Sequence, residues 1–252
     1  MTRIGLALTM LGAAMIGGIA PVSAASIALV MAVDVSDSVS TERYVLQRDG
    51  IAQAFETLPL VDAIAAQPGG IEVLVLEWSD PDKIAVTVGW TRVFDRASAA
   101  NFAAAVHATK RTSHGLTAIG AAMLAAADAL DRLPEPADHR IIDVSGDGMA
   151  NFGPPPAPVR DRLVAGGITI NGLAILTEEP WLADYYKQNV IGGDAAFCLV
   201  AETMDSFAEA MLKKLVQEVA GDGISRRPRA SRGPGATVTS LAPAFPTRNQ
   251  MQ

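Results

Sequence analysis

Cysteine is almost absent from this sequence, since Cys198 is the only one among 252 residues. A single cysteine cannot close an internal disulfide, which excludes the small exported domains that depend on a disulfide framework. The chain is long enough to bury one domain of roughly 200 residues. We therefore expect a fold that is stabilised by a hydrophobic core.

After residue 25 the sequence lacks long apolar runs. No segment there reaches the roughly 18 apolar residues that a membrane span needs. The opening residues differ, because Arg3 precedes an apolar stretch at residues 4–20 and small side chains follow. This order is typical of a secretory signal peptide that is cleaved after Ala24 or Ala25. We expect residues 1–25 to be removed from an exported protein, periplasmic or extracellular. An uncleaved membrane anchor is the alternative, although glycines and a proline within residues 17–21 weaken a continuous helix.

Net positive charge is lacking in the central part of the chain. Residues 26–221 hold 14 Lys and Arg against 26 Asp and Glu, a net charge of −12. Such an acidic domain argues against nucleic acid as the main partner. Residues 222–252 instead carry five arginines and one aspartate among prolines, glycines and serines, without apolar periodicity. We expect this Arg/Pro/Ser-rich tail to be disordered.

Apolar runs with strand character alternate with helix-like stretches through residues 26–221. The expected strands are residues 27–33, 71–78, 83–90, 139–145, 168–176 and 196–201. The expected helices are residues 42–58, 98–109, 118–133, 159–165, 181–189 and 206–220. This alternation predicts an α/β fold in which helices cover both faces of a mostly parallel sheet.

One pair of expected strands departs from this alternation. Only the turn-forming residues 79–82 separate the strand at residues 71–78 from the strand at residues 83–90, which indicates a hairpin. We therefore predict a doubly wound, six-stranded sheet with one antiparallel edge strand. Such sheets bind ligands at the carboxyl ends of their strands, where the strand order reverses. We expect the first and fourth strands to flank that point.

Oxygen donors occur at three places along the chain. Asp34, Ser36 and Ser38 come directly after the first expected strand, Thr117 opens a helix, and Asp147 follows the fourth strand. Carboxylate and hydroxyl oxygens are hard ligands, which suit Mg²⁺ or Ca²⁺ rather than zinc or copper. If the three loops meet at one edge of the sheet, these five residues form a divalent-cation site.

Each of these residues also has a purely structural interpretation. Asp34 and Ser36 can cap the following helix, Thr117 can be an N-cap, and the loop around Asp147 can be a simple turn. All three interpretations would have to coincide at one sheet edge, and that coincidence favours the cation site. The residues considered for the rim of the site are Asp37, His114 and Asn151.

The order Asp-x-Ser-x-Ser, then Thr, then Asp resembles the metal-ion-dependent adhesion site (MIDAS) of von Willebrand factor type A (vWA) domains. The resemblance covers about residues 26–220 and extends to a group of short exported bacterial proteins of this fold. It implies that Ser36, Ser38 and either Thr117 or an aspartate bind the metal directly, while the remaining residues act through water. It also implies an open coordination position for a carboxylate from a partner protein or surface polymer. Mg²⁺ is the expected cation because it takes few protein ligands, with Mn²⁺ or Ca²⁺ as alternatives.

The sequence lacks three common catalytic or nucleotide-binding motifs. Ser145 is flanked by Asp143 and Asp147, where a nucleophile elbow needs glycines. The sequence has no phosphate-binding P-loop, and no dinucleotide-binding glycine motif follows the first strand. A metal-assisted hydrolase would need a general base, for which His114 and nearby acids are the candidates. We expect a cation-dependent recognition module, with a hydrolase or a metal-independent interaction module as alternatives.

Overall fold

The computed structural model describes residues 24–177 and 179–221. The signal peptide expected at residues 1–25 lies almost wholly outside these residues, and the tail expected at residues 222–252 lies wholly outside them. Within the described part, no helix combines the length and the apolar character that crossing a membrane requires.

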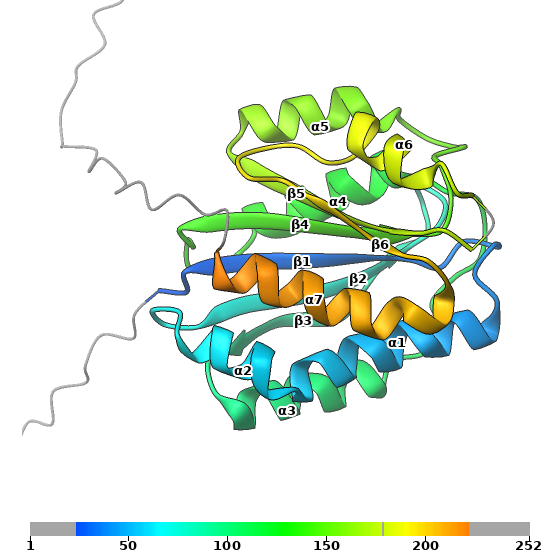
Figure 1. Cartoon of the computed structure of the whole chain (residues 1–252). Helices are drawn as coiled ribbons and strands as arrows, with labels where there is room; N and C mark the ends of the chain where they lie inside the picture. The colour runs from blue at the N-terminus through cyan, green and yellow to red at the C-terminus, as the bar shows by residue number, and fades with distance from the viewer. Residues whose placement is uncertain (1–23, 178, 222–252) are drawn as a thin grey trace, which may run out of the picture.

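A six-stranded sheet forms the centre of the molecule (Figure 1), in the order β3-β2-β1-β4-β5-β6. Its strands are β1 (Ile27–Asp34), β2 (Ile71–Trp78), β3 (Ile84–Val93), β4 (His139–Gly146), β5 (Ile168–Ile175) and β6 (Cys198–Ala201). The β2–β3 pair is antiparallel and every other neighbouring pair is parallel. The predicted doubly wound sheet with one antiparallel edge strand is therefore confirmed.

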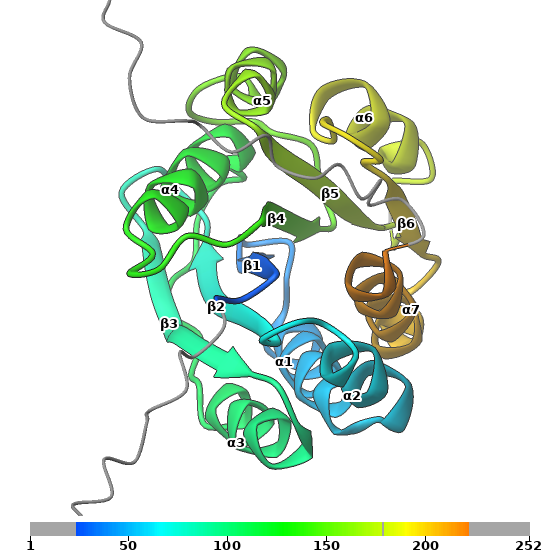
Figure 2. The same ribbon diagram turned by 90° about the vertical axis from the view of Figure 1, so that its left-hand side faces the viewer.

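Helices cover both faces of this sheet, as Figure 2 shows. They are α1 (Thr41–Glu56), α2 (Leu58–Ala65), α3 (Arg96–His107), α4 (Ile119–Asp131), α5 (Pro156–Ala165), α6 (Leu182–Asn189) and α7 (Phe207–Ala220), with a 3₁₀ turn at Met204–Ser206. One apolar layer joins the sheet to α1, α2, α3 and α7, and the other joins it to α4, α5 and α6. Every residue of β1 is buried, because alternate side chains along it enter opposite layers.

The first helical region differs from its predicted form. The continuous helix expected at residues 42–58 ends at Glu56, and a separate helix follows at Leu58–Ala65. Thr57 separates the two, because both its backbone N–H and its hydroxyl donate to the carbonyl oxygen of Ala54. Pro59 then occupies the first turn of α2, where a missing N–H costs nothing. The Thr-Leu-Pro sequence is the helix-start signal that the prediction passed over.

One face of the sheet carries a buried cluster of charged residues. Lys214 of α7 places its Nζ 2.5 Å from Oδ1 of Asp143 on β4 and 2.6 Å from Oε1 of Glu218. Asn171 on β5 donates a further hydrogen bond to Glu218. Burial raises the pKa of Glu218 to about 7, against the opposing effect of the Lys214 ammonium. The carboxyl groups of Asp143 and Glu218 thus share the ammonium of Lys214, and all three side chains are buried.

Candidate metal site

Strand order brings two of the predicted loops together. β1 lies between β2 and β4, and its register places Val33 beside Ser145. The chain moves outward from β1 to β3 and then returns to β4, so the order reverses between β1 and β4. Asp34 is the last residue of β1 and Asp147 follows β4, so both lie at the same carboxyl edge. The expected reversal of strand order between the first and fourth strands is confirmed.

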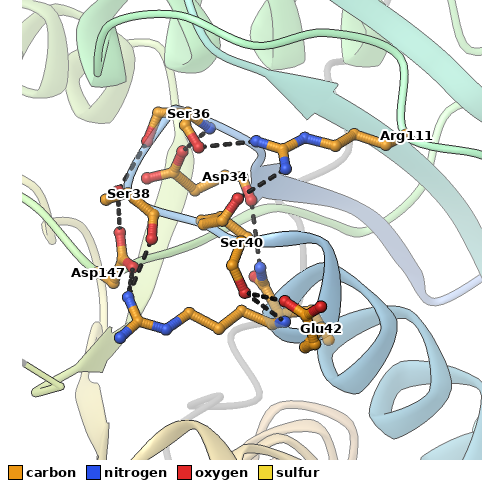
Figure 3. Close-up of polar contacts among 10 residues, drawn as sticks. Asp34, Ser36, Ser38, Ser40, Glu42, Arg111 and Asp147 are labelled. Carbon is orange, nitrogen blue, oxygen red and sulfur yellow. Dashed lines mark hydrogen bonds and ion pairs between the residues drawn. The ribbon is translucent and has the colours of Figure 1, made fainter.

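Asp34 is fully buried at the end of β1. Its Oδ1 accepts a 2.7 Å hydrogen bond from the backbone N–H of Ser36, which is an Asx turn (Figure 3). Its Oδ2 is buried without a hydrogen-bond partner among the described residues. Burial raises the pKa of this carboxyl group to about 7, and the bonds from Ser36 only partly oppose that rise. The N-cap of α1 is Ser40, so Asp34 and Ser36 do not cap that helix and the cap interpretation is wrong. The Asx turn accounts for one carboxylate oxygen and leaves the other without a hydrogen-bond partner among the described residues.

Two serine hydroxyls connect this carboxylate to the third loop. The Oγ atoms of Ser36 and Ser38 lie 3.2 Å apart within hydrogen-bonding distance, and Ser38 donates a 2.5 Å hydrogen bond to Oδ1 of Asp147 (Figure 3). The Asp147 side chain is only 2% exposed. The first and third loops thus form one continuous set of oxygen atoms.

A cavity of about 180 Å³ opens where these loops meet the second loop. Its wall includes Ser38, Thr117 and Asp147, together with Arg43, Asn151, Thr177 and Glu179. Asp34 and Ser36 lie beneath the surface, while Ser38 is exposed. The structure thus brings all five predicted site residues to one edge of the sheet.

Thr117 does not cap the following helix. The N-cap of α4 is Ala118, and no side chain caps that helix. Instead, the amide of Thr117 donates to Oδ1 of Asn151 at 2.8 Å, and the amide of Asn151 donates to the Thr117 carbonyl. The N-cap interpretation is therefore wrong, and Asn151 fixes the backbone of Thr117 at the wall of the cavity.

The other two residues considered for the rim lie farther out. The side chains of Asp37 and His114 are 72% and 65% exposed, and His114 Nδ1 lies 3.8 Å from Asp37 Oδ1. His114 lines a separate cavity with Lys83 and Thr112. The Asp37 backbone N–H donates to the Gly115 carbonyl oxygen, so Asp37 contributes to the contact between the first two loops.

Two arginines that the sequence did not point to hold the first loop. Arg111 donates to the carbonyl oxygens of Val35, Ser36 and Val39 at 2.6 to 2.9 Å. Figure 3 shows Arg111 beside Ser36. Arg43, from the first turn of α1, donates to the carbonyl oxygen of Ser38 at 2.9 Å. Arginine presents several donors in a rigid plane, which suits it to fixing a loop backbone.

Gly146 and Tyr186 complete the floor of the site. A Cβ atom at Gly146 would lie 2.8 Å from Asp34 Oδ2 and 2.8 Å from the Tyr186 hydroxyl. Both of these oxygens are buried without a hydrogen-bond partner in the described part of the chain. Only glycine lets the backbone approach them this closely. Tyr186 lies on α6, and its closeness to Asp34 could not be read from the sequence.

The chemistry of these residues fits a hard divalent cation. The set holds two carboxylates and three neutral hydroxyls, all of them oxygen donors. Within residues 24–177 and 179–221, no group of three or more His, Cys, Asp or Glu residues forms a metal cluster of another kind. Asp34, Ser36, Ser38, Thr117 and Asp147 would hold the cation, and the orphaned Asp34 oxygen is the group most in need of one.

Comparison with solved structures identifies the fold. Proximal thread matrix protein 1 from the mussel byssus, solved with a zinc-occupied MIDAS, is 17% identical with a TM-score of 0.55, over 77% of this chain and 46% of that chain. A von Willebrand factor type A protein from Catenulispora acidiphila is 17% identical with a TM-score of 0.54, over 79% of this chain and 43% of that chain. The vWF domain of the type V pili tip protein Mfa5 from Porphyromonas gingivalis is 11% identical with a TM-score of 0.54, over 77% of this chain and 95% of that chain. The chain therefore has a vWA fold and spans less than half the length of the first two proteins.

No curated protein matches this sequence. A family described as "Protein of unknown function (DUF1194)" matches residues 24–223, which include the whole sheet and all five site residues. The chain belongs to this family, and its fold is that of a vWA domain.

Proposed function

We propose that this protein is a divalent-cation-binding recognition module. Asp34, Ser36, Ser38, Thr117 and Asp147 would hold the cation, and an acidic group of a partner protein or surface polymer would complete its coordination. The observation that carries this proposal is the buried Oδ2 of Asp34, which lacks a hydrogen-bond partner among the described residues. Leaving such a group unpaired is costly, and a cation bound at this edge would compensate it.

The choice of ligands supports recognition rather than simple storage of the metal. Three of the five side chains are neutral hydroxyls, and the resemblance to the MIDAS places at least one of the two carboxylates behind a water molecule. The groups in direct contact would therefore leave part of the cation's charge unneutralised. The remaining charge would attract a carboxylate from outside, through the cavity in which Ser38 and Asp147 meet. Mg²⁺ is the first candidate, with Mn²⁺ and Ca²⁺ as alternatives. The zinc at the MIDAS of the mussel protein supports metal binding without identifying the metal here.

A location outside the cytoplasm agrees with the sequence and with the similar structures. Residues 1–25 have the pattern of a signal peptide. The matched proteins include a byssus thread protein and a pilus tip domain. An exported module of this kind would meet its partner at the cell envelope or beyond it.

A metal-dependent hydrolase is the alternative proposal. Its general base would have to lie within hydrogen-bond reach of a group on the cation. His114, which the sequence suggested for this role, lines a different cavity, whereas Glu179 lies in the wall of the metal-site cavity. Hydrolysis of a model ester or phosphoester that disappears in Thr117→Ala would favour this alternative.

Partner capture with and without a chelator tests the recognition proposal. The tagged chain, immobilised in Mg²⁺, is incubated with an envelope extract and then washed with or without EDTA. We expect a specific partner to be retained in Mg²⁺, released by EDTA, and absent with Asp34→Ala. A partner that stays bound in EDTA would instead support the metal-independent module.

A further inference from the structure

The cavity at the metal site contains a positively charged side chain. Arg43 forms part of the wall that also includes Ser38, Thr117 and Asp147. Its Nη1 donates to the Ser38 carbonyl oxygen at 2.9 Å and lies 3.5 Å from Oδ2 of Asp147. The Arg43 side chain is 24% exposed and forms part of the cavity wall.

The position of Arg43 is unusual for a site that is meant to hold a cation. The positive charge of Arg43 offsets part of the negative charge of Asp147. It would also repel a divalent ion bound beside that carboxylate. Among the described residues of the cavity wall, the charges are those of Arg43, Asp147 and Glu179. For binding the metal alone, an uncharged residue at position 43 would serve better. A role toward an anion resolves this conflict.

We propose that Arg43 is a second anchor for the acidic group of the partner, beside the cation. This inference rests on the proposed function. A carboxylate has two oxygens, so one can coordinate the cation while the other accepts a hydrogen bond from the guanidinium. In the free protein the same charge lowers the affinity for the cation. Arg43 therefore makes cation binding and partner binding depend on each other: the partner's negative charge relieves the repulsion between guanidinium and metal.

The competing explanation is that Arg43 only holds the first loop through the Ser38 carbonyl. The two explanations give opposite signs for Arg43→Gln. If Arg43 only supports the loop, its loss loosens the ligands and weakens cation binding. If its charge matters as we propose, its loss strengthens cation binding and weakens carboxylate binding.

Two titrations of the purified chain test this inference. Mn²⁺ binding is measured by calorimetry, and acetate is then titrated into the Mn²⁺-loaded protein while water-proton relaxation reports displacement of metal-bound water. We expect Arg43→Gln to bind Mn²⁺ about three- to tenfold more tightly and acetate about three- to tenfold more weakly, the scale of one unit charge at short range in a high-dielectric site. Arg43→Lys keeps the charge and should bind Mn²⁺ within about threefold of the parent chain, because the charge sets the repulsion.

Arg48→Gln is the matched control, because Arg48 lies on the same helix with the same 24% side-chain exposure and pairs with Asp49. It should change neither affinity, and circular dichroism verifies that all variants are folded. Equal or weaker Mn²⁺ binding by Arg43→Gln, or unchanged acetate binding, would overturn the inference and leave the metal site intact. A parent chain that binds no Mn²⁺ would overturn the proposed function itself, and this inference with it.

Discussion

The hydroxyl of Ser38 donates a 2.5 Å hydrogen bond to Oδ1 of Asp147, across 109 positions of the sequence. The bond forms because β1 and β4 are neighbours in the sheet, so the loops after them share one edge. Ser38 is exposed whereas the Asp147 side chain is buried. The pair therefore marks the point at which buried carboxylates meet a surface from which a partner can approach.

Removing the charge of Asp34 should stabilise the metal-free protein. Burial raises the pKa of Asp34 to about 7, so above that pH the folded chain holds a buried carboxylate that is poorly compensated. Asparagine keeps the shape and the acceptor for the Ser36 amide. We expect Asp34→Asn to raise the free energy of unfolding at pH 8 in EDTA by about 1–3 kcal/mol, measured by urea denaturation.

Asp37→Asn is the control for this change, since Asp37 lies in the same loop with a 72% exposed side chain. Its effect should stay within about 0.5 kcal/mol. A destabilised Asp34→Asn would mean that the carboxylate already has a stabilising partner in the absence of metal.

A methyl group at Gly146 should damage the floor of the site. The added Cβ would lie 2.8 Å from both Asp34 Oδ2 and the Tyr186 hydroxyl, so at least one of these groups must move. We expect Gly146→Ala to lower the free energy of unfolding by about 2 kcal/mol and the cation affinity by about tenfold. Thermal denaturation and calorimetric titration measure the two effects.

Gly89→Ala provides the comparison, because a Cβ at Gly89 on the edge strand β3 meets no atom within 4 Å. The free energy of unfolding and the cation affinity of Gly89→Ala should both match those of the parent chain. If Gly146→Ala also matched the parent chain, Asp34 would have more freedom to move than the packing indicates.

The buried cluster around Lys214 should make stability depend on pH. Burial raises the pKa of Glu218 from 4.5 to about 7, so the folded chain binds this proton more tightly than the unfolded chain. The stabilisation from this group is complete below pH 4.5 and is lost as the pH rises through 7. In the parent chain the free energy of unfolding should fall as the pH rises from 4.5 through 7. We expect this fall to be smaller by up to about 3 kcal/mol in Glu218→Gln, measured by urea denaturation in EDTA across the same pH range.

The same measurement on Glu209→Gln gives the matched control, since Glu209 is exposed on the same helix. Its pH profile should follow that of the parent chain. Asp34 also titrates in this pH range, but its contribution to the pH dependence is the same in all three proteins and cancels when their profiles are compared. Parallel profiles for Glu218→Gln and the parent chain would show that Glu218 is already ionised in the folded state.

Much of the fold was predictable because its central strands are buried on both faces. Such strands appear in the sequence as continuous apolar runs, and β1 is buried along its whole length. The division between α1 and α2 was missed because the apolar rhythm continues across Thr57, although Pro59 marks a new helix start. The spacing of apolar residues cannot reveal a break of a single residue between two helices.

The candidate site was predictable only as far as its motif. Asp34 ends β1, Thr117 lies just before α4 and Asp147 follows β4, and the order of these elements determines where the three residues meet. Arg111 contacts the first loop from 72 to 76 positions away, and no local pattern links the two. Tyr186 reaches Asp34 through the packing of α6, which the sequence does not specify. Residues that support a site from other elements become visible only in three dimensions.

Calorimetric titration of the purified chain with Mg²⁺, Mn²⁺ and Ca²⁺ tests the central claim most directly. We expect at least one of these cations to bind with one ion per chain, and Asp34→Ala to abolish that binding. The bound cation should also raise the melting temperature, because it binds the folded state alone. If none of the three cations bound, or if Asp34→Ala bound them as well as the parent chain does, the cation site proposed here would be contradicted.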